Sequence, residues 1–449
     1  MEERFLRISA DAEKKQEEQF RIWGAGEGIP FQDAGAKAAY QERVGLIKDA
    51  IQLRQEPRRI PICPSAGFFP MQYAGVTMYD AMYDYGALKK AWMAYHLDFE
   101  PDAYTGPQNI VPGRVLDMLD LKLYEWPGHG VPKEREYQFV EQEYMKEEEY
   151  QDLIDDPTAF FLNVYFPRIL GSLKPFATFP LLPLVNEIPA VPAMASAFGT
   201  EGMRAALESL CQAGEEALRW RAVVREINGH IMGKGYPAFA GGFTKAPFDV
   251  VGDSLRGTKG IMLDMFRYPD ELKEACERLT PIMVKCGVSV CRANGHIMSF
   301  IPLHKGADGF MSDEQFRTFY WPSLRKLIIG LVNEGIVPQL FAEGSYSERL
   351  EVISDLPKGK VVWWFDRTDM KKVKETVGRV ACVAGNVPLD LLCTGTPDEI
   401  KACCRELIDD AGAGGGFIFS TGAGMQGSKK ENVKAMIEFS KEYGIYKRR

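Results

Sequence analysis

The stretch Val337–Tyr346, which reads VPQLFAEGSY, decides how the rest of the chain is interpreted. Its apolar run stops at Ala342 and is followed by the carboxylate Glu343 and by Gly344. In α/β folds ligands bind at the carboxyl ends of the strands, so a buried strand that ends on an ionisable side chain predicts a functional residue. A carboxylate that caps the next helix is the alternative, because acids favour helix N-termini.

The segment before this stretch predicts the most regular helix of the sequence. Ser312 is its expected N-cap, with Gln315 at the capping-box position, and Gly335 ends it. Pro322 inside the pattern predicts a kink or a locally broken turn. The apolar stripe of this helix consists of Phe316, Phe319, Tyr320, Leu324, Leu327, Ile328 and Leu331.

The same alternation of helix and short strand recurs along the chain. Apolar strands are predicted near residues 60, 102, 237, 299, 339, 363, 382 and 417, each followed by a helical pattern. Eight such units predict an α/β protein with a (β/α)₈ TIM-type barrel. An open doubly wound sheet is the rival, but no dinucleotide-type glycine fingerprint follows a first strand.

Two segments do not fit the repeating unit. Residues 1–40 predict an N-terminal helical extension, and the barrel is expected to occupy residues 41–449. Residues 119–150 contain strand-like pieces around a Pro/Gly turn and predict a lid-like β-excursion inserted after strand 2.

Composition restricts the classes of partner. The chain has 449 residues, with 46% hydrophobic and 26% charged residues, as is ordinary for a globular protein. A net charge of −8 argues against nucleic acid. No apolar run is long enough to span a membrane, and the charged N-terminus lacks the apolar region of a signal peptide. Nine cysteines without a CxxC spacing predict reduced thiols and a cytoplasmic location.

Several polar side chains stand at predicted strand ends. His304, one of five histidines, follows the strand near 299, and Asp366 follows VVWWF. Each has an alternative interpretation, as a hydrogen-bonded structural histidine and a helix cap respectively. Lys245 is a candidate cation or a salt-bridge partner, and Asn386 either orients a ligand or holds its turn. HEXXH, GxSxG, Walker A and zinc-finger spacings are absent, and no metal is expected.

Five blocks of sequence resemble the uroporphyrinogen decarboxylase superfamily. They are RIPIC at 59–63, EPDA at 100–103, PLHKGADGFMSDEQFRTFYWPSLRKLI at 302–328, AGNVPLDLLCTGTPDEI at 384–400 and ENVKAMI at 431–437. The resemblance is strongest from about residue 290 to 440. It implies a (β/α)₈ barrel and either a decarboxylase of haem synthesis or a cobalamin-dependent methyltransferase, and it is closest in character to the methyltransferase branch.

The family's functional residues are mostly missing at the matching positions. The decarboxylase's paired arginines are replaced within Pro64–Phe68, its acidic residue falls near Gly106, and its histidine falls at Ala423. A polycarboxylate porphyrinogen is therefore not an expected substrate. The zinc-binding His-x-Cys of the thiol-activating methyltransferases becomes Phe341-Ala342-Glu343, and their later cysteine also becomes Ala423, so a zinc site is not expected.

The resemblance and the remaining residues together give the leading hypothesis. It is a corrinoid-dependent methyltransferase that demethylates a neutral, aromatic-type methyl ether and passes the methyl group to cob(I)alamin. The chain shows no DxHxxG motif, so the cobalamin is expected on a partner corrinoid protein. Glu343 is the expected acid, with a pKa raised by apolar surroundings, and His304 or Asp366 assists. The expected substrate-binding residues are Phe68, Phe69, Thr105, Lys245, Phe341, Trp364 and Asn386.

Two alternatives stay open. The first is a decarboxylase or other lyase of the same superfamily that acts on a small carboxylic acid, with Lys245 or Arg367 supplying the cation. The second is a ligand-binding barrel without catalytic activity. Neither alternative involves nucleic acid or a membrane.

Overall fold

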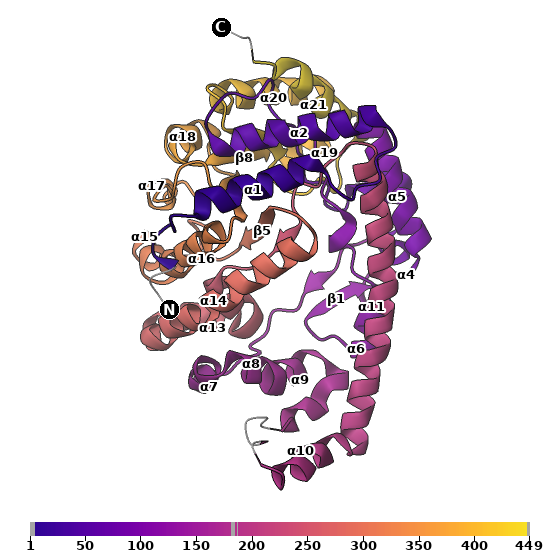
Figure 1. Ribbon diagram of the computed structural model, residues 1–449, viewed down its shortest axis with the longest axis vertical. Coiled ribbons are helices and arrows are strands. Elements are labelled where there is room, and N and C mark those ends of the chain that lie inside the picture. Colours follow the sequence, from indigo (N-terminus) through magenta and orange to yellow (C-terminus); the bar gives the residue numbers. More distant parts are fainter. Residues whose placement is uncertain (1–4, 181–184, 186, 447–449) are drawn as a thin grey trace.

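A parallel β-sheet forms the centre of the computed structural model, which describes residues 5–180, 185 and 187–446 (Figure 1). The strand order is β4-β5-β6-β7-β8-β9, and every neighbouring pair is parallel. The strands are β4 (Gly242–Phe243), β5 (Met298–Leu303), β6 (Val337–Ala342), β7 (Val362–Phe365), β8 (Cys382–Val387) and β9 (Phe417–Thr421). The predicted α/β class is confirmed.

The first two predicted strands are extended segments with isolated bridges. Ile62 bridges Phe419 of β9, and Tyr104 bridges Ala238, just before β4. Asp102 donates its backbone N–H to the Ile62 carbonyl over 2.8 Å, which links the two segments. Prolines flank both segments and lack the N–H that a regular ladder requires. The regular sheet therefore has six strands where the sequence predicted eight.

Helices connect the strands and pack around the sheet. Those that follow β4 are α12 (Pro247–Asp249), α13 (Gly257–Arg267), α14 (Pro269–Ala293), α15 (Asp313–Gln315), α16 (Trp321–Asn333), α17 (Leu350–Ile353), α18 (Met370–Glu375), α19 (Leu389–Thr394), α20 (Pro397–Ala411) and α21 (Lys430–Tyr443). The earlier part of the chain contributes α3 (Phe69–Ala74), α4 (Met78–Tyr83), α5 (Tyr85–Phe99) and α6 (Gly113–Leu119).

The helix before β6 has the predicted ends and the predicted irregularity. Ser312 Oγ accepts the Gln315 N–H, and Gln315 Oε1 accepts the Ser312 N–H over 2.9 Å, which completes the capping box. Pro322 has no N–H to donate, and a π-helical turn at Phe316–Tyr320 separates α15 from α16. Gly335 follows with a φ of 79°, which favours glycine.

The N-terminal helices α1 (Ala12–Ala25) and α2 (Ala34–Gln52) cover the amino ends of the strands. Trp23 of α1 and Ile47 of α2 belong to the same buried cluster as Val337 and Val362, the first residues of β6 and β7. This packing fills the interior of the sheet at the amino ends of the strands. A ligand would therefore enter at the carboxyl ends or at the flank. The domain boundary near residue 40 stays a prediction.

The chain between the second and third predicted strands forms a separate arm. It contains a small sheet of β1 (Tyr124–Pro127), β2 (Gly130–Val131) and β3 (Gln138–Phe139), followed by α7 (Tyr150–Asp155), α8 (Pro157–Phe160), α9 (Phe166–Ile169) and α10 (Ala190–Phe198). Helix α11 (Glu201–Gly233), about 50 Å long at 1.5 Å per residue, returns from α10 to the sheet (Figure 1).

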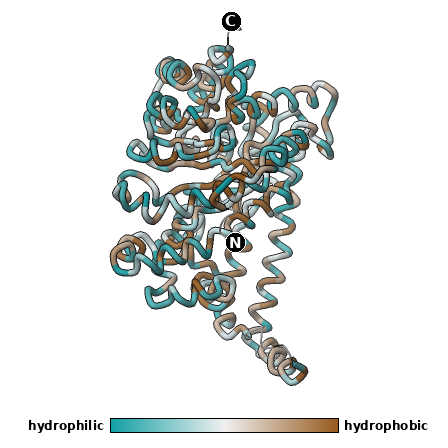
Figure 2. The backbone as a smooth tube through the Cα atoms, turned by 60° about the vertical axis from the view of Figure 1, so that its left-hand side comes forward, coloured by the Kyte–Doolittle hydropathy of each residue, from teal (hydrophilic) through white to brown (hydrophobic). Residues whose placement is uncertain are grey.

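Hydropathy follows this division of the fold. Figure 2 shows hydrophobic stretches through the middle of the molecule, where the strands lie, and alternating colours along the long projecting helix. None of the described helices is long and apolar enough to cross a membrane.

Candidate functional site

His304 stands at the carboxyl end of β5, between two carboxylates. Its Nδ1 lies 2.5 Å from Asp253 Oδ2, and its Nε2 lies 3.4 Å from Glu343 Oε1, just beyond the end of β6. Since neighbouring parallel strands end at the same edge, the fold brings these two strand-end residues together. The sequence predicted both as site residues, and the structure places them in contact.

Asp249 fixes the backbone of this strand end. Its carboxylate is fully buried and accepts the N–H groups of His304, over 3.1 Å, and Lys305, over 3.0 Å. It also accepts the Tyr320 hydroxyl over 2.7 Å. Asp253 is four residues further on, in the π-helical turn Val250–Leu255. Sequence analysis missed both aspartates, although their i, i+4 spacing after TKAP would have placed them on one helical face.

The hydrogen bonds decide which of these groups is charged. Burial opposes a charge on His304, but hydrogen bonds to Asp253 and Glu343 outweigh it and raise the pKa of His304 to about 10. Burial also opposes a charge on Asp253, but His304 and Lys245 hold its pKa below the ordinary value. Burial and the Asp253 charge raise the pKa of Asp249. At neutral pH the site therefore contains an imidazolium between Asp253 and Glu343.

Replacing Asp253 with asparagine is expected to lower the pKa of His304, because it removes the strongest group that favours the imidazolium. The folded-state pKa lies above the ordinary 6.5, so the stability contributed by the protonated histidine is complete below pH 6.5 and lost as pH rises through about 10. An NMR titration of the imidazole protons measures both values. An identical midpoint in wild type and Asp253→Asn would contradict the assigned pair, and His129, an exposed histidine, provides the internal reference.

Asp366 lies beside Glu343 after β7. Its Oδ2 accepts the Gly344 N–H over 3.0 Å and lies 3.7 Å from Nε of the largely exposed Arg367. Burial raises the pKa of Asp366, and the Glu343 charge adds to this. Asp366 thus holds the backbone that carries Glu343, which makes it a positioning residue in this structure.

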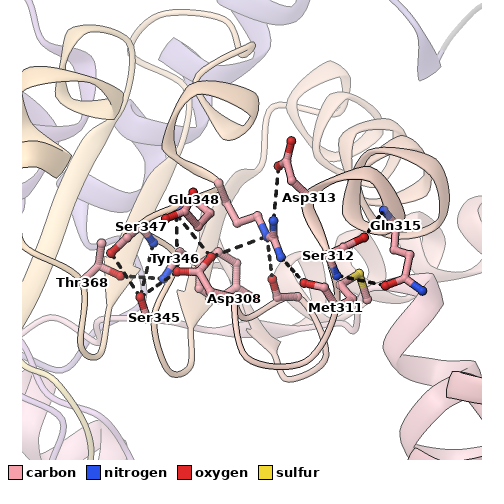
Figure 3. Close-up of polar contacts among 12 residues, drawn as sticks. Asp308, Met311, Ser312, Asp313, Gln315, Ser345, Tyr346, Ser347, Glu348 and Thr368 are labelled. Carbon is pink, nitrogen blue, oxygen red and sulfur yellow. Dashed lines mark hydrogen bonds and ion pairs between the residues drawn. The ribbon is translucent and has the colours of Figure 1, made fainter.

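A polar network joins the loops that carry His304 and Glu343 (Figure 3). Ser345 donates its hydroxyl to Asp308 over 2.7 Å, and Tyr346 donates its N–H to Thr368 Oγ1 over 3.0 Å. The buried Arg349 lies 3.6 Å from Asp308 and 3.2 Å from Asp313. These contacts tie together the loops after β5, β6 and β7 and hold the charged pair in place.

A cavity of about 230 Å³ lies in the interior of the sheet, and neither His304 nor Glu343 lines it. Phe239, Phe300 and Trp364 form aromatic walls, and the buried Gln339 lies among them. None of the described residues that line the cavity is charged. The other lining residues are Ser65, Gly67, Thr105, Gly106, Gln108, Asn109, Ala240, Gly241, Gly242, Phe243, Val290 and Asn294.

Three predicted substrate-binding residues lie at this cavity or on its wall. Thr105 lines it and accepts the Ala66 N–H over 3.1 Å. Trp364 lines it and packs on Phe341, with ring centroids 4.8 Å apart, and Phe341 stacks on Phe300. Phe341 is not among the lining residues, and it lies on the face of β6 that also carries Gln339 and Glu343.

The other four predicted binding residues have structural partners elsewhere. Phe69 begins α3 and is buried against Tyr95 and Phe99, so its assignment as a substrate contact is corrected. The Phe68 ring contacts Tyr137. Lys245 Nζ lies 2.8 Å from Asp253, and the Asn386 side-chain amide donates to the Thr368 carbonyl over 2.7 Å. Lys245 is thus in a salt bridge, and Asn386 makes a hydrogen bond to a neighbouring loop.

The charged cluster around His304 does not offer the ligands of a metal site. Within residues 5–180, 185 and 187–446, no group of three or more His, Cys, Asp or Glu side chains is arranged to hold a metal ion. Both ring nitrogens of His304 are engaged by carboxylates. The donor set therefore does not fit a zinc site.

Comparison with known proteins supports the family resemblance. The sequence model of the family Uroporphyrinogen decarboxylase (URO-D) matches residues 225–443. A uroporphyrinogen decarboxylase from Mannheimia succiniciproducens is 25% identical over 233 residues, which are 50% of this chain and 63% of that protein. The chain thus aligns with less than two thirds of this curated relative. The resemblance to the uroporphyrinogen decarboxylase superfamily is confirmed over the C-terminal half of the chain.

A solved structure shows that the likeness of fold extends further. A methyltransferase from Methanosarcina mazei superimposes with a TM-score of 0.57 and 18% sequence identity. The superposition covers 90% of this chain and 98% of that one. At this identity the comparison establishes a shared fold.

Proposed function

We propose that this protein is a methyltransferase of the corrinoid-dependent type, built on the (β/α)₈ barrel of its superfamily. It transfers a methyl group from a neutral aromatic methyl ether to cob(I)alamin carried by a partner corrinoid protein. The observation that carries the proposal is an uncharged aromatic cavity on the same sheet as a protonated histidine–carboxylate pair at the strand ends. The fold shared with a methyltransferase from Methanosarcina mazei is consistent with it.

The cavity favours a neutral ligand. Aromatic walls bury an aromatic ring well, and a carboxylate placed among them would lack a compensating cation. Lys245 is already paired with Asp253, and the Arg367 side chain is 82% exposed. The two candidate cations of the lyase alternative are thus engaged or directed to solvent.

The charged pair supplies a proton where an ether oxygen would leave. When the methyl–oxygen bond breaks, its electron pair stays on the oxygen, which then needs a proton. In the structure Glu343 is 43% exposed, so the expected apolar surroundings are not present. The proton instead resides on His304, and its Nε2–H is directed at Glu343. Glu343 relays to the departing oxygen the proton that it receives from His304 Nε2, which leaves a neutral imidazole that Asp253 keeps oriented.

The corrinoid belongs on the partner protein. A cavity of about 230 Å³ holds a small aromatic molecule and not a corrin ring. When bound to its partner, a reduced corrinoid supplies the nucleophile that accepts the methyl group. On this chain, the loops tied together by Asp308, Ser345 and Arg349 form the rim that faces such a partner.

The test uses the purified protein with methoxylated aromatics, reduced cobalamin and a corrinoid protein. Formation of methylcobalamin, followed in the visible spectrum, is the expected result. Release of CO₂ from a small carboxylic acid, without methyl transfer from any ether, would favour the lyase. Absence of both reactions with ligand binding preserved would favour the non-catalytic barrel.

A further inference from the structure

Gln339 is a buried polar side chain in the middle of an apolar strand. It has no exposed surface, and neither its Nε2 nor its Oε1 has a hydrogen-bond partner among the described residues. An unpaired buried amide is costly, by about 1–3 kcal/mol for each unsatisfied group. Such a group calls for a binding partner, and Gln339 differs from other buried amides in lying against the aromatic cavity.

The strand register fixes where this amide points. Gln339 is opposite Phe300 of β5 and Val362 of β7, and Phe341 is opposite Trp364. Side chains two residues apart share a face, so Gln339 forms one layer of the interior and Phe341 and Trp364 the next layer. The amide therefore lies level with Phe300 and one layer before the rings of Phe341 and Trp364.

The chemistry of this position specifies the ligand group that it accepts. An amide offers one acceptor oxygen and two N–H donors. A ligand that satisfies both ends must donate to Oε1 and accept from Nε2. The lining carries no charge, so the ligand group is neutral, which leaves a hydroxyl or a carboxamide.

The spacing along β6 sets the length of the ligand. Glu343 lies four residues beyond Gln339 on the same face, about 13 Å at 3.3 Å per residue. Hydrogen bonds of about 2.9 Å at each end leave about 7 Å between the two polar groups. One benzene ring with substituents at opposite ends fits this span, with the ring against Phe341 and Trp364.

We infer that Gln339 binds the non-reacting end of the substrate, a neutral hydroxyl or carboxamide para to the methyl ether. The assignment of the ether as the reacting end rests on the proposed function. The binding of the polar end by Gln339 rests on geometry alone. It makes Gln339 a specificity-determining residue and selects para-substituted aromatic ethers from the wider class of methyl ethers.

The experiment measures ligand affinity by calorimetry and by quenching of tryptophan fluorescence, since Trp364 lines the cavity. The probes are 4-methoxyphenol, 4-methoxybenzamide, 4-methoxytoluene and 2-methoxyphenol, each with wild type, Gln339→Leu and Gln339→Met. We expect wild type to bind 4-methoxyphenol or 4-methoxybenzamide at least about tenfold more tightly than 4-methoxytoluene. In both variants that ratio should fall to about one. The tighter of the two polar probes identifies the group.

Controls separate a ligand contact from a structural role. Gln212→Leu, on the exposed surface of α11, should keep the wild-type ratio. Without ligand, Gln339→Met should melt no lower than wild type, because replacing an unpaired amide with an apolar group of similar shape is neutral or stabilising. A lower melting temperature in both Gln339 variants would assign a structural role instead.

Three results would overturn the inference: an unchanged ratio in both Gln339 variants, equal wild-type affinity for 4-methoxyphenol and 2-methoxyphenol, or no binding of any probe. Failure of methyl transfer with the expected binding pattern intact would overturn the proposed function and leave the role of Gln339 standing.

Discussion

Glu343→Gln is expected to slow methyl transfer by about 10²–10⁴-fold, the usual contribution of a positioned acid. The amide cannot release a proton to the departing oxygen, although it can still accept the hydrogen bond of His304. Affinity for 4-methoxytoluene should change little, because the amide that replaces the carboxyl group can still donate a hydrogen bond to the ether oxygen. Single-turnover spectroscopy of corrinoid methylation measures the rate, and calorimetry measures the affinity.

The matched control is Glu348→Gln. Glu348 lies in the same loop, is exposed, and contacts Asp308 only through its backbone N–H. We expect wild-type rates from this variant. A Glu343→Gln enzyme with more than half of the wild-type rate would remove Glu343 from the mechanism. His304→Gln should then be examined as the direct acid, since its ring holds the proton in the resting state.

Arg256→Met is expected to destabilise the protein by about 3–5 kcal/mol, because it leaves buried Asp264 without its cation. Arg256 is 2% exposed, and its Nε lies 2.6 Å from Asp264 Oδ2. It also donates to the Met145 carbonyl over 2.6 Å, and Tyr150 donates its hydroxyl to Asp264 over 2.8 Å. These bonds connect the segment after the small sheet to α13. Urea unfolding followed by circular dichroism gives the change in free energy.

Arg21→Met provides the comparison. Arg21 forms two hydrogen bonds with Glu18 on α1, but both side chains are at least half exposed. Removing an exposed pair of this kind changes stability by about 1 kcal/mol or less. A loss of similar size in the two variants would show that solvent reaches Arg256 despite its burial. The double variant Arg256→Met/Asp264→Leu should recover much of the loss, because no uncompensated charge remains.

The strand-end residues were predictable because short apolar strands and helices alternate regularly along the chain. A short apolar run places the next polar residue at the edge of a parallel sheet, and this rule located His304, Glu343 and Asp366. Side chains alternate along a strand, so Trp363 and Trp364 face opposite sides, and the structure places Trp364 in the cavity and Trp363 in the outer core.

Residues outside the strand ends were harder to place. Phe69 and Phe68 are adjacent in a loop, and only the start of α3 at Phe69 turns that ring into the core. Asp253 reaches His304 from a π-helical turn that no periodic pattern specifies. Gln339 was visible as a lone amide in VPQLF, but only the register shows that both of its polar atoms face the interior. In the same way, the prolines leave two predicted strands as extended segments with isolated bridges.

The short strand β4 at the edge of the sheet has a consequence for the order in which the reactants combine. The cavity reaches the surface beside Phe243, 53% exposed, and Val290, 39% exposed, both at the flank where β4 is only two residues long. The proposed partner would approach at the strand ends, away from this flank. An entrance at the flank would let the small molecule enter or leave while the protein partner stays docked. Such an enzyme is expected to work through a ternary complex with random addition, so that a single encounter between the two proteins supports exchange of one ligand for the next.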